Sequence, residues 1–539
     1  MNTHSLLTLA EQSHYQQTGR TDEVERLCAA FAATWPDEVR SFEFGRSVEG
    51  RPMLALLASR SGALSAQSLR ERNIPVLMIQ AGIHPGESDG KDAGFIVLRG
   101  LLGDPKRSGV LEHIALLFVP AFNTDGHERV GRWNRPNQNG PEITGWRTTA
   151  QNLNLNRDYT KADAPEMRAM LRLIHEWDPL ICADLHVTDG ADFEPDISIQ
   201  VEPINQGAES LRSSGLQLRE ALIAKLAARG SIPLPFYPDL VETDNPASGF
   251  VLTVYSPRFS TGYFPQRNRF TVLVETHSWK PYEHRVRVMG HSISGLAGLT
   301  AKHGGDWLQR ARQADAEAAA SLAGSDLVLD YKSSWREPAR AGNTNLSAAA
   351  VSGAETIDFR GYAYTRLQSE ISGGPVTVYD PATPQIWRVP YRNKVEPSVI
   401  VRAPGGGYVV PPAYAQDLGE RLAAHGVELF SLPAVVKNLE VEVFRAAGAS
   451  FSAAPFEGRM RVALEGEWQA ERQEIAANAL FVPLAQPLAR LIVALFEPRA
   501  PDSFAAWGFF NACFEQKEQM EPYVLEQMAR DVLAADPGV

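Results

Sequence analysis

Short, continuous apolar runs recur along the first 300 residues. Val, Ile and Leu dominate four of them, at Val76–Ala81, Ala115–Pro120, Leu180–Leu185 and Phe270–Val274. Continuous rather than alternating apolar runs are typical of strands that are covered on both faces. Stretches with helical spacing, such as Ala164–Trp177, lie between them. The alternation predicts an α/β layer with a largely parallel or mixed sheet.

Local signals mark where several of these elements begin. Residues 22–35 combine helical apolar spacing with an acidic first turn, which favours a helix. Two β-rich segments flank the turn Glu49–Pro52, which predicts a hairpin. Asp163 is expected to cap the helix over 164–177, with Glu166 at the capping-box position.

The pattern changes near residue 325. The alanine-rich stretch Arg310–Gly324 predicts a helix that closes a first domain, residues 1–325. Shorter β-like runs punctuated by Gly and Pro follow, so residues 326–539 are expected to form a second, mostly β domain. Its helical tail is predicted from about Asp502. No motif in this second domain indicates a function.

Composition excludes several classes of protein. With 44% hydrophobic and 22% charged residues, the chain has an ordinary globular composition. A formal net charge of -12 argues against a nucleic-acid partner. The three cysteines, Cys28, Cys182 and Cys513, form no CxxC pair and are expected to be buried and unpaired. Neither an apolar leader nor a run of about 18 apolar residues is present, so we expect no membrane partner and a cytoplasmic location by default. The oligomeric state is not predicted.

Metal-ligating side chains follow two of the apolar runs. His84 and Glu87 come just after Val76–Ala81, and His186 ends the run that begins at Leu180. Ligand sites in α/β sheets lie outside the carboxyl ends of the strands. A catalytic zinc needs three protein ligands and one open position. The sequence therefore predicts one zinc ion on His84, Glu87 and His186.

A carboxylate and several cations complete the candidate site. Glu275 ends the run Phe270–Val274, where an unused buried carboxylate would be costly, so it is a candidate general base for a zinc-activated water. Arg147, Asn156 and Arg157 lie in one loop. They could hold a substrate carboxylate or stabilise a developing oxyanion.

Taken in order, these motifs resemble the zinc metallocarboxypeptidases of the carboxypeptidase A type. The resemblance covers roughly residues 40–300 and rests on six segments: Gly45–Met53, His84–Glu87, Phe122–Gly126, Arg147–Tyr159, Asp184–His186 and Thr271–Ser278. It implies a mixed, mainly parallel eight-stranded sheet flanked by helices, and the zinc ligands already named.

The resemblance also implies a function. The protein would be a zinc-dependent carboxypeptidase whose substrate is a peptide with a free C-terminal carboxylate. Glu275 would act as general base and then as proton donor to the leaving amine. Arg147 would stabilise the oxyanion, while Asn156 and Arg157 would hold the terminal carboxylate.

The chain departs from the family pattern at several positions. Asn154 stands where the family has an Asp that supports the first zinc histidine, so His84 is expected to be a weaker zinc ligand. Gly86 stands where digestive members carry an arginine. Tyr263 is preferred over Tyr255 as the mobile tyrosine that covers the substrate, because Gly262 allows loop motion. Arg258 or Arg267 could favour an acidic terminal residue.

Two other functions fit the same motifs. A zinc-dependent deacylase of the aspartoacylase or succinylglutamate desuccinylase type also uses HxxE and a DLH-like third ligand. A non-catalytic peptide-binding protein with this fold is the other alternative.

Overall fold

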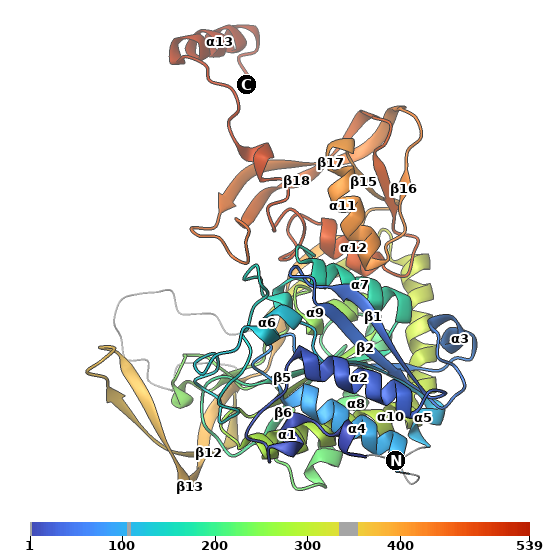
Figure 1. Cartoon of the computed structure of the whole chain (residues 1–539). Coiled ribbons are helices and arrows are strands. Elements are labelled where there is room, and N and C mark those ends of the chain that lie inside the picture. Colours follow the sequence, from blue (N-terminus) through green and yellow to red (C-terminus); the bar gives the residue numbers. More distant parts are fainter. Residues whose placement is uncertain (1–2, 105–108, 334–353, 539) are drawn as a thin grey trace.

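A computed structural model describes residues 3–104, 109–333 and 354–538, and its first part is built around one mixed eight-stranded sheet (Figure 1). The four central strands are parallel, and the outer pairings are antiparallel except for the last one. The predicted fold class is confirmed. In spatial order the strands are β1 (Val39–Arg46), β2 (Pro52–Ala58), β4 (Ala115–Val119), β3 (Val76–Gln80), β5 (Ile181–Val187), β10 (Phe270–Thr276), β6 (Ile197–Glu202) and β7 (Pro233–Leu234).

Both faces of this sheet are covered, which explains the continuous apolar runs. In β3, Leu77 and Ile79 point into one apolar core, and Val76 and Met78 point into the other. The Leu77 face packs against helices α2 (Thr21–Thr34), α4 (Asp89–Gly103), α8 (Glu209–Ala227) and α10 (Tyr282–Ser321), and the opposite face packs against α7 (Pro165–Trp177).

Two sequence expectations about helices need correction. Asp163 does not cap α7: the N-cap residue is Ala164, and no side chain caps it. The Asp163 carboxylate instead pairs with Arg421 and Arg459, which lie far along the chain. The helix expected over 310–324 is the final part of the 40-residue α10.

Short elements join the main ones. They are η1 (Thr3–Leu6), α1 (Leu9–Gln12), α3 (Ala66–Glu71), α5 (Val110–His113), α6 (Thr124–Glu128), η2 (Leu155–Arg157), β8 (Asp239–Leu240), η3 (Pro246–Ser248), β9 (Phe250–Val251) and α9 (Ser260–Gln266).

Residues beyond 325 form a mostly β region with a helical tail, as expected. Two long hairpins dominate it: β12–β13, which extends from the body in Figure 1, and β17–β18. Its elements are β11 (Asp326–Ser333), β12 (Glu355–Gln368), β13 (Pro375–Arg392), β14 (Val395–Arg402), β15 (Gly407–Val410), α11 (Pro412–His425), β16 (Phe430–Ser431), β17 (Val436–Phe451), β18 (Val462–Ile475), β19 (Leu480–Pro483), α12 (Ala489–Phe496), η4 (Asn511–Phe514) and α13 (Pro522–Ala535).

This region shares an apolar core with the sheet. Leu418 and Leu422 of α11 and Leu491 of α12 belong to the same buried cluster as Val76 and Met78 of β3. Helix α11 packs directly on α7. The C-terminal region therefore covers the α7 side of the sheet, while α13 stands away from the body with no buried residue (Figure 1). The domain boundary near residue 325 stays a prediction.

Two smaller expectations can be compared with the structure. Cys28 and Cys182 are buried and unpaired as predicted, whereas Cys513 is exposed. Among the helices of the three described ranges, none has the length and apolar character needed to cross a membrane.

Candidate active site

The parallel centre of the sheet brings the predicted site residues to one edge. Strands β3, β5 and β10 run in the same direction as neighbours, so their carboxyl ends lie side by side. His84 and Glu87 occupy the loop that leads from β3 into α4. His186 on β5 is the register partner of Glu275 on β10.

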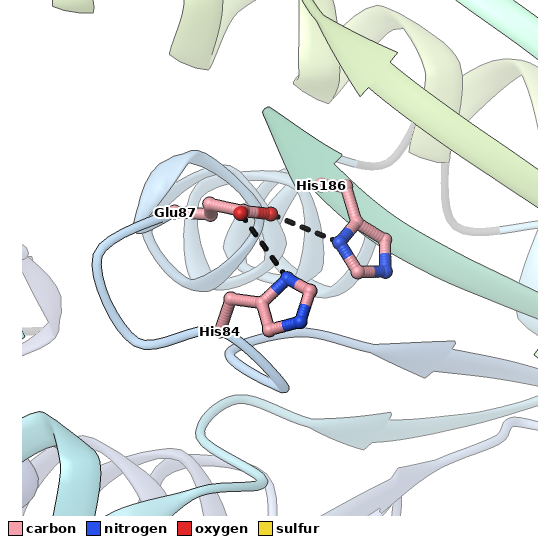
Figure 2. Close-up of side chains that lie close together, drawn as sticks. All are labelled: His84, Glu87 and His186. Atoms are coloured by element: carbon pink, nitrogen blue, oxygen red, sulfur yellow. Dashed lines mark hydrogen bonds and ion pairs between the residues drawn. The ribbon is translucent and has the colours of Figure 1, made fainter. Parts of the chain in front are cut away.

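His84, Glu87 and His186 converge as a metal site requires. Each offers one ligand atom, and these atoms all lie within 4.8 Å of one another. Figure 2 shows the Glu87 carboxylate facing both imidazole rings. Its Oε1 lies 3.1 Å from His84 Nδ1, and its Oε2 lies 2.9 Å from His186 Nδ1. All three side chains are buried.

The outward-facing ring nitrogens of both histidines are held by other side chains. His84 Nε2 lies 3.1 Å from Asn154 Oδ1. His186 Nε2 lies 3.1 Å from Asp184 Oδ2, an ion-pair distance without the alignment of a hydrogen bond. The Nδ1 atoms of both histidines therefore face the Glu87 carboxylate. This donor set, with its supporting acceptors, fits a zinc ion.

Charges around the trio are compatible with metal binding. Burial lowers the pKa of His84 to about 4, so its ring is neutral and can act as a ligand. Burial would also lower the pKa of His186, but Asp184 and Glu87 raise it well above its ordinary value. Burial opposes ionisation of Glu87, yet His84 and Arg135 hold its pKa well below the usual range. A metal ion would take the place of the His186 proton, so binding should release a proton.

Arg135 also belongs to the site and was not found from the sequence. Its Nη1 donates to Glu87 Oε1 at 3.1 Å, and its Nη2 donates to the carbonyl oxygens of Val187 at 3.1 Å and Thr188 at 3.3 Å. A Cβ at Gly86 would lie only 2.5 Å from Arg135 Cγ. Gly86 therefore leaves the space that the Arg135 stem occupies. Nothing in the spacing around Arg135 signals this contact.

Glu275 lies on β10 beside His186, its register partner on β5. Its side chain is 8% exposed, and its Oε2 has no hydrogen-bond partner in the described part of the chain. Burial raises the pKa of Glu275 to about 8; the charges of Glu87 and Asp189 add to the increase, and His186 opposes it. A carboxyl group with such a pKa can accept and return a proton near neutral pH.

Arg147 contacts the trio directly, and Asn156 is linked to it through Asn154. Arg147 is 36% exposed, and its Nη1 lies 3.3 Å from Glu87 Oε1. Asn156 belongs to η2, directly after the Asn154 that supports His84, and its buried Oδ1 has no hydrogen-bond partner among the residues described. Arg147 therefore contacts the metal-binding group, whereas Asn156 donates its backbone N–H to the Asn154 Oδ1 that contacts His84.

Arg157 lies in a cationic environment. Its guanidinium stacks over the ring of Phe259, with Cζ 4.1 Å from the ring centroid. Burial, together with the charges of Arg147 and Arg258, lowers the pKa of Arg157 to about 10. A cluster of cations that repel one another is suited to binding an anion such as a carboxylate.

The position of Tyr263 corrects the expectation that it covers the substrate. Its side chain is fully buried, and its hydroxyl lies 2.9 Å from Nδ1 of His425 in the C-terminal region. Arg267 is also buried there and donates to the His425 carbonyl oxygen. Tyr255, the other candidate, is partly exposed and lies near the site: burial raises its pKa, as do the charges of Asp239 and Glu275. Gly262 and Tyr263 both lie buried in α9, so the neighbouring glycine does not indicate a mobile loop.

The fold and the site define an α/β protein with a buried His–Glu–His metal site at the carboxyl edge of a mixed sheet. Residues 24–193 match the family described as zinc carboxypeptidase, which confirms the resemblance inferred from the ordered motifs.

Proteins named carboxypeptidase are among the relatives that this chain matches. The chain is 30% identical to carboxypeptidase D of Drosophila melanogaster over 155 residues and 30% identical to carboxypeptidase Z of Homo sapiens over 146 residues. These matches cover 28% and 25% of this chain but only 10% and 21% of the relatives. Among solved structures, carboxypeptidase A from Helicoverpa armigera is similar with a TM-score of 0.38 and 17% identity, over 54% of this chain and 74% of that one.

Proposed function

We propose that the protein is a zinc-dependent carboxypeptidase that hydrolyses the C-terminal bond of peptides. The observation that carries the proposal is the meeting of His84, Glu87 and His186 beside the buried carboxyl group of Glu275. Three ligands with a proton acceptor alongside are the parts that hydrolysis by an activated water requires.

Separate residues would bind the metal and transfer the proton. His84, Glu87 and His186 would hold the zinc, which when bound acts as a Lewis acid and lowers the pKa of water. Glu275 takes the proton of the attacking water and later donates it to the leaving amine. Its pKa of about 8 in the metal-free site falls when a cation lies nearby, so the carboxylate form is available at neutral pH.

Cationic side chains select and orient the substrate. Arg157 and Asn156 bind the terminal carboxylate, so only the last peptide bond reaches the zinc-binding residues. Arg147, whose guanidinium already contacts Glu87, stabilises the negative charge that develops on the carbonyl oxygen. A peptide with a free C-terminus is therefore the proposed substrate.

A peptide library analysed by mass spectrometry, with and without a chelator, tests the proposal. Loss of single C-terminal residues, abolished by the chelator and absent for C-terminally amidated peptides, is the expected result. N-acyl amino acids are included because their hydrolysis, with intact peptides, would indicate the deacylase alternative. Stoichiometric zinc without hydrolysis of either substrate set would favour the binding-protein alternative.

A further inference from the structure

The turn between β17 and β18 reaches the candidate active site from the C-terminal region. Glu457 in this turn accepts a hydrogen bond from the backbone N–H of Asn154, with 2.8 Å between N and Oε2. Asn154 supports His84 through its side chain and precedes Asn156 and Arg157 in η2. One carboxylate from the C-terminal region therefore holds the segment on which the proposed metal and substrate contacts depend.

The turn is built in a way that ordinary turn chemistry does not favour. Glu457 and Gly458 both have positive φ, 50° and 78°, and Arg459 N donates to Phe456 O at 3.1 Å. Two consecutive positive φ values are the signature of a type I′ turn, which prefers Asn-Gly. A glutamate in the left-handed region is strained, and strain of this kind concentrates at functional positions. The longer side chain is what reaches Asn154.

Further contacts fix the turn against the same part of the molecule. Arg459 binds Asp163 through two hydrogen bonds of 2.6 Å, just beyond η2. Asp502 accepts from the Arg258 backbone N–H at 2.9 Å and from its guanidinium at 3.1 Å. The Glu457 charge also raises the pKa of Arg157, against the lowering by burial and the neighbouring arginines. The C-terminal region thus supplies carboxylates to two segments of the site.

We infer that the C-terminal region is part of the substrate-binding site and that Glu457 is a positioning residue for the segment from Asn154 to Arg157. The effect of Glu457 on substrate binding rests on the proposed function. Its effect on His84 is independent of that function, because Asn154 contacts His84 whether or not a peptide is hydrolysed.

Three variants of the full chain test the inference. Glu457→Asn gives the turn its preferred Asn-Gly sequence but shortens the side chain by one methylene, so the contact with Asn154 is lost without harm to folding. Glu457→Gln keeps the length and the acceptor oxygen but removes the charge. Glu465→Gln is the matched control, because Glu465 is exposed on β18 of the same hairpin.

Zinc affinity, measured by competition with a fluorescent chelator, is the readout that needs no activity. Glu457→Asn should weaken zinc binding about 3-fold to 10-fold, because removing a residue that supports a metal ligand typically costs about 10-fold to 100-fold in affinity and Glu457 acts one contact further out. The melting temperature of this variant should be no lower than that of the wild type. On peptides with free C-termini its KM should rise about 10-fold with kcat nearly unchanged, because substrate positioning is affected. Glu457→Gln and Glu465→Gln should stay close to the wild type.

The outcomes separate the two proposals. If the wild type hydrolyses no peptide, the proposed function fails, and zinc affinity alone then decides the role of Glu457. Unchanged zinc affinity and unchanged KM in Glu457→Asn would overturn the inference. Equal impairment in Glu457→Gln would overturn it too, because the charge rather than the hydrogen bond would then matter.

Discussion

Replacing Glu275 with Gln should stabilise the metal-free protein while abolishing hydrolysis. The Glu275 carboxyl group is buried, and its Oε2 has no hydrogen-bond partner within the described ranges. Ionisation in such a place is costly. A neutral amide of nearly the same shape avoids this cost but cannot accept the proton of water.

The size of the effect follows from the pKa of Glu275. Burial raises it from 4.5 to about 8 in the folded protein. Because the folded state holds the proton more tightly, the stabilisation is complete below the unfolded pKa and is lost as pH rises from about 4.5 to about 8. One pKa unit corresponds to about 1.4 kcal/mol, so the wild type should lose about 3 kcal/mol more than the Gln variant between pH 5 and pH 8.

Thermal unfolding in the presence of a chelator measures this difference. The melting temperatures of wild type and Glu275→Gln should be similar at pH 5 and should diverge by a few degrees at pH 8, with the variant higher. Glu465→Gln, an exposed change, should follow the wild type at every pH. If the melting temperatures of wild type and Glu275→Gln changed in parallel with pH, the raised pKa of Glu275 would be refuted. With zinc restored, the Gln variant should bind the metal but lose at least about 100-fold in kcat.

The remaining predictions concern the metal site and the ion pairs of Arg269. Zinc should raise the melting temperature of the wild type but not of His84→Ala, because a ligand that binds only the folded state stabilises it. Asn154→Asp would put a charged acceptor 3.1 Å from His84 Nε2 and should tighten zinc binding by up to about 10-fold in chelator competition; weaker binding would contradict it. Arg269 pairs with Asp178 at 2.7 Å and Asp315 at 2.9 Å; because both carboxylates are partly exposed, Arg269→Met should lower the free energy of unfolding by about 2 kcal/mol in urea titrations.

The ends of the central strands could be predicted because the signal is local. A run buried on both faces is mostly apolar, so a polar side chain near its end indicates the edge of the sheet. His84 follows β3, and His186 and Glu275 each lie one residue before the end of β5 and β10. Parallel neighbours bring such ends together, and the ligand trio follows from the topology.

The errors concern residues whose partners are distant in sequence. Asp163 has the sequence context of a helix cap, but Arg459, 296 residues further along, binds its carboxylate. Tyr263 looks like a loop residue beside glycine, but His425 binds its hydroxyl in the core, 162 residues away. Local propensity decides such positions only when no distant side chain competes for them.

The same reasoning explains why the C-terminal region gave no functional signal in the sequence. Its apolar residues complete the core on the α7 side of the sheet. Glu457 binds the backbone N–H of Asn154, and Asp502 binds both the backbone N–H and the guanidinium of Arg258. A backbone N–H carries no side-chain identity, so the contact with Glu457 leaves no pattern at Asn154 that spacing could reveal. The proposed metal ligands and general base can therefore be identified in the first 300 residues, whereas the contacts that hold Asn154 and Arg258 come from residues more than 200 positions away.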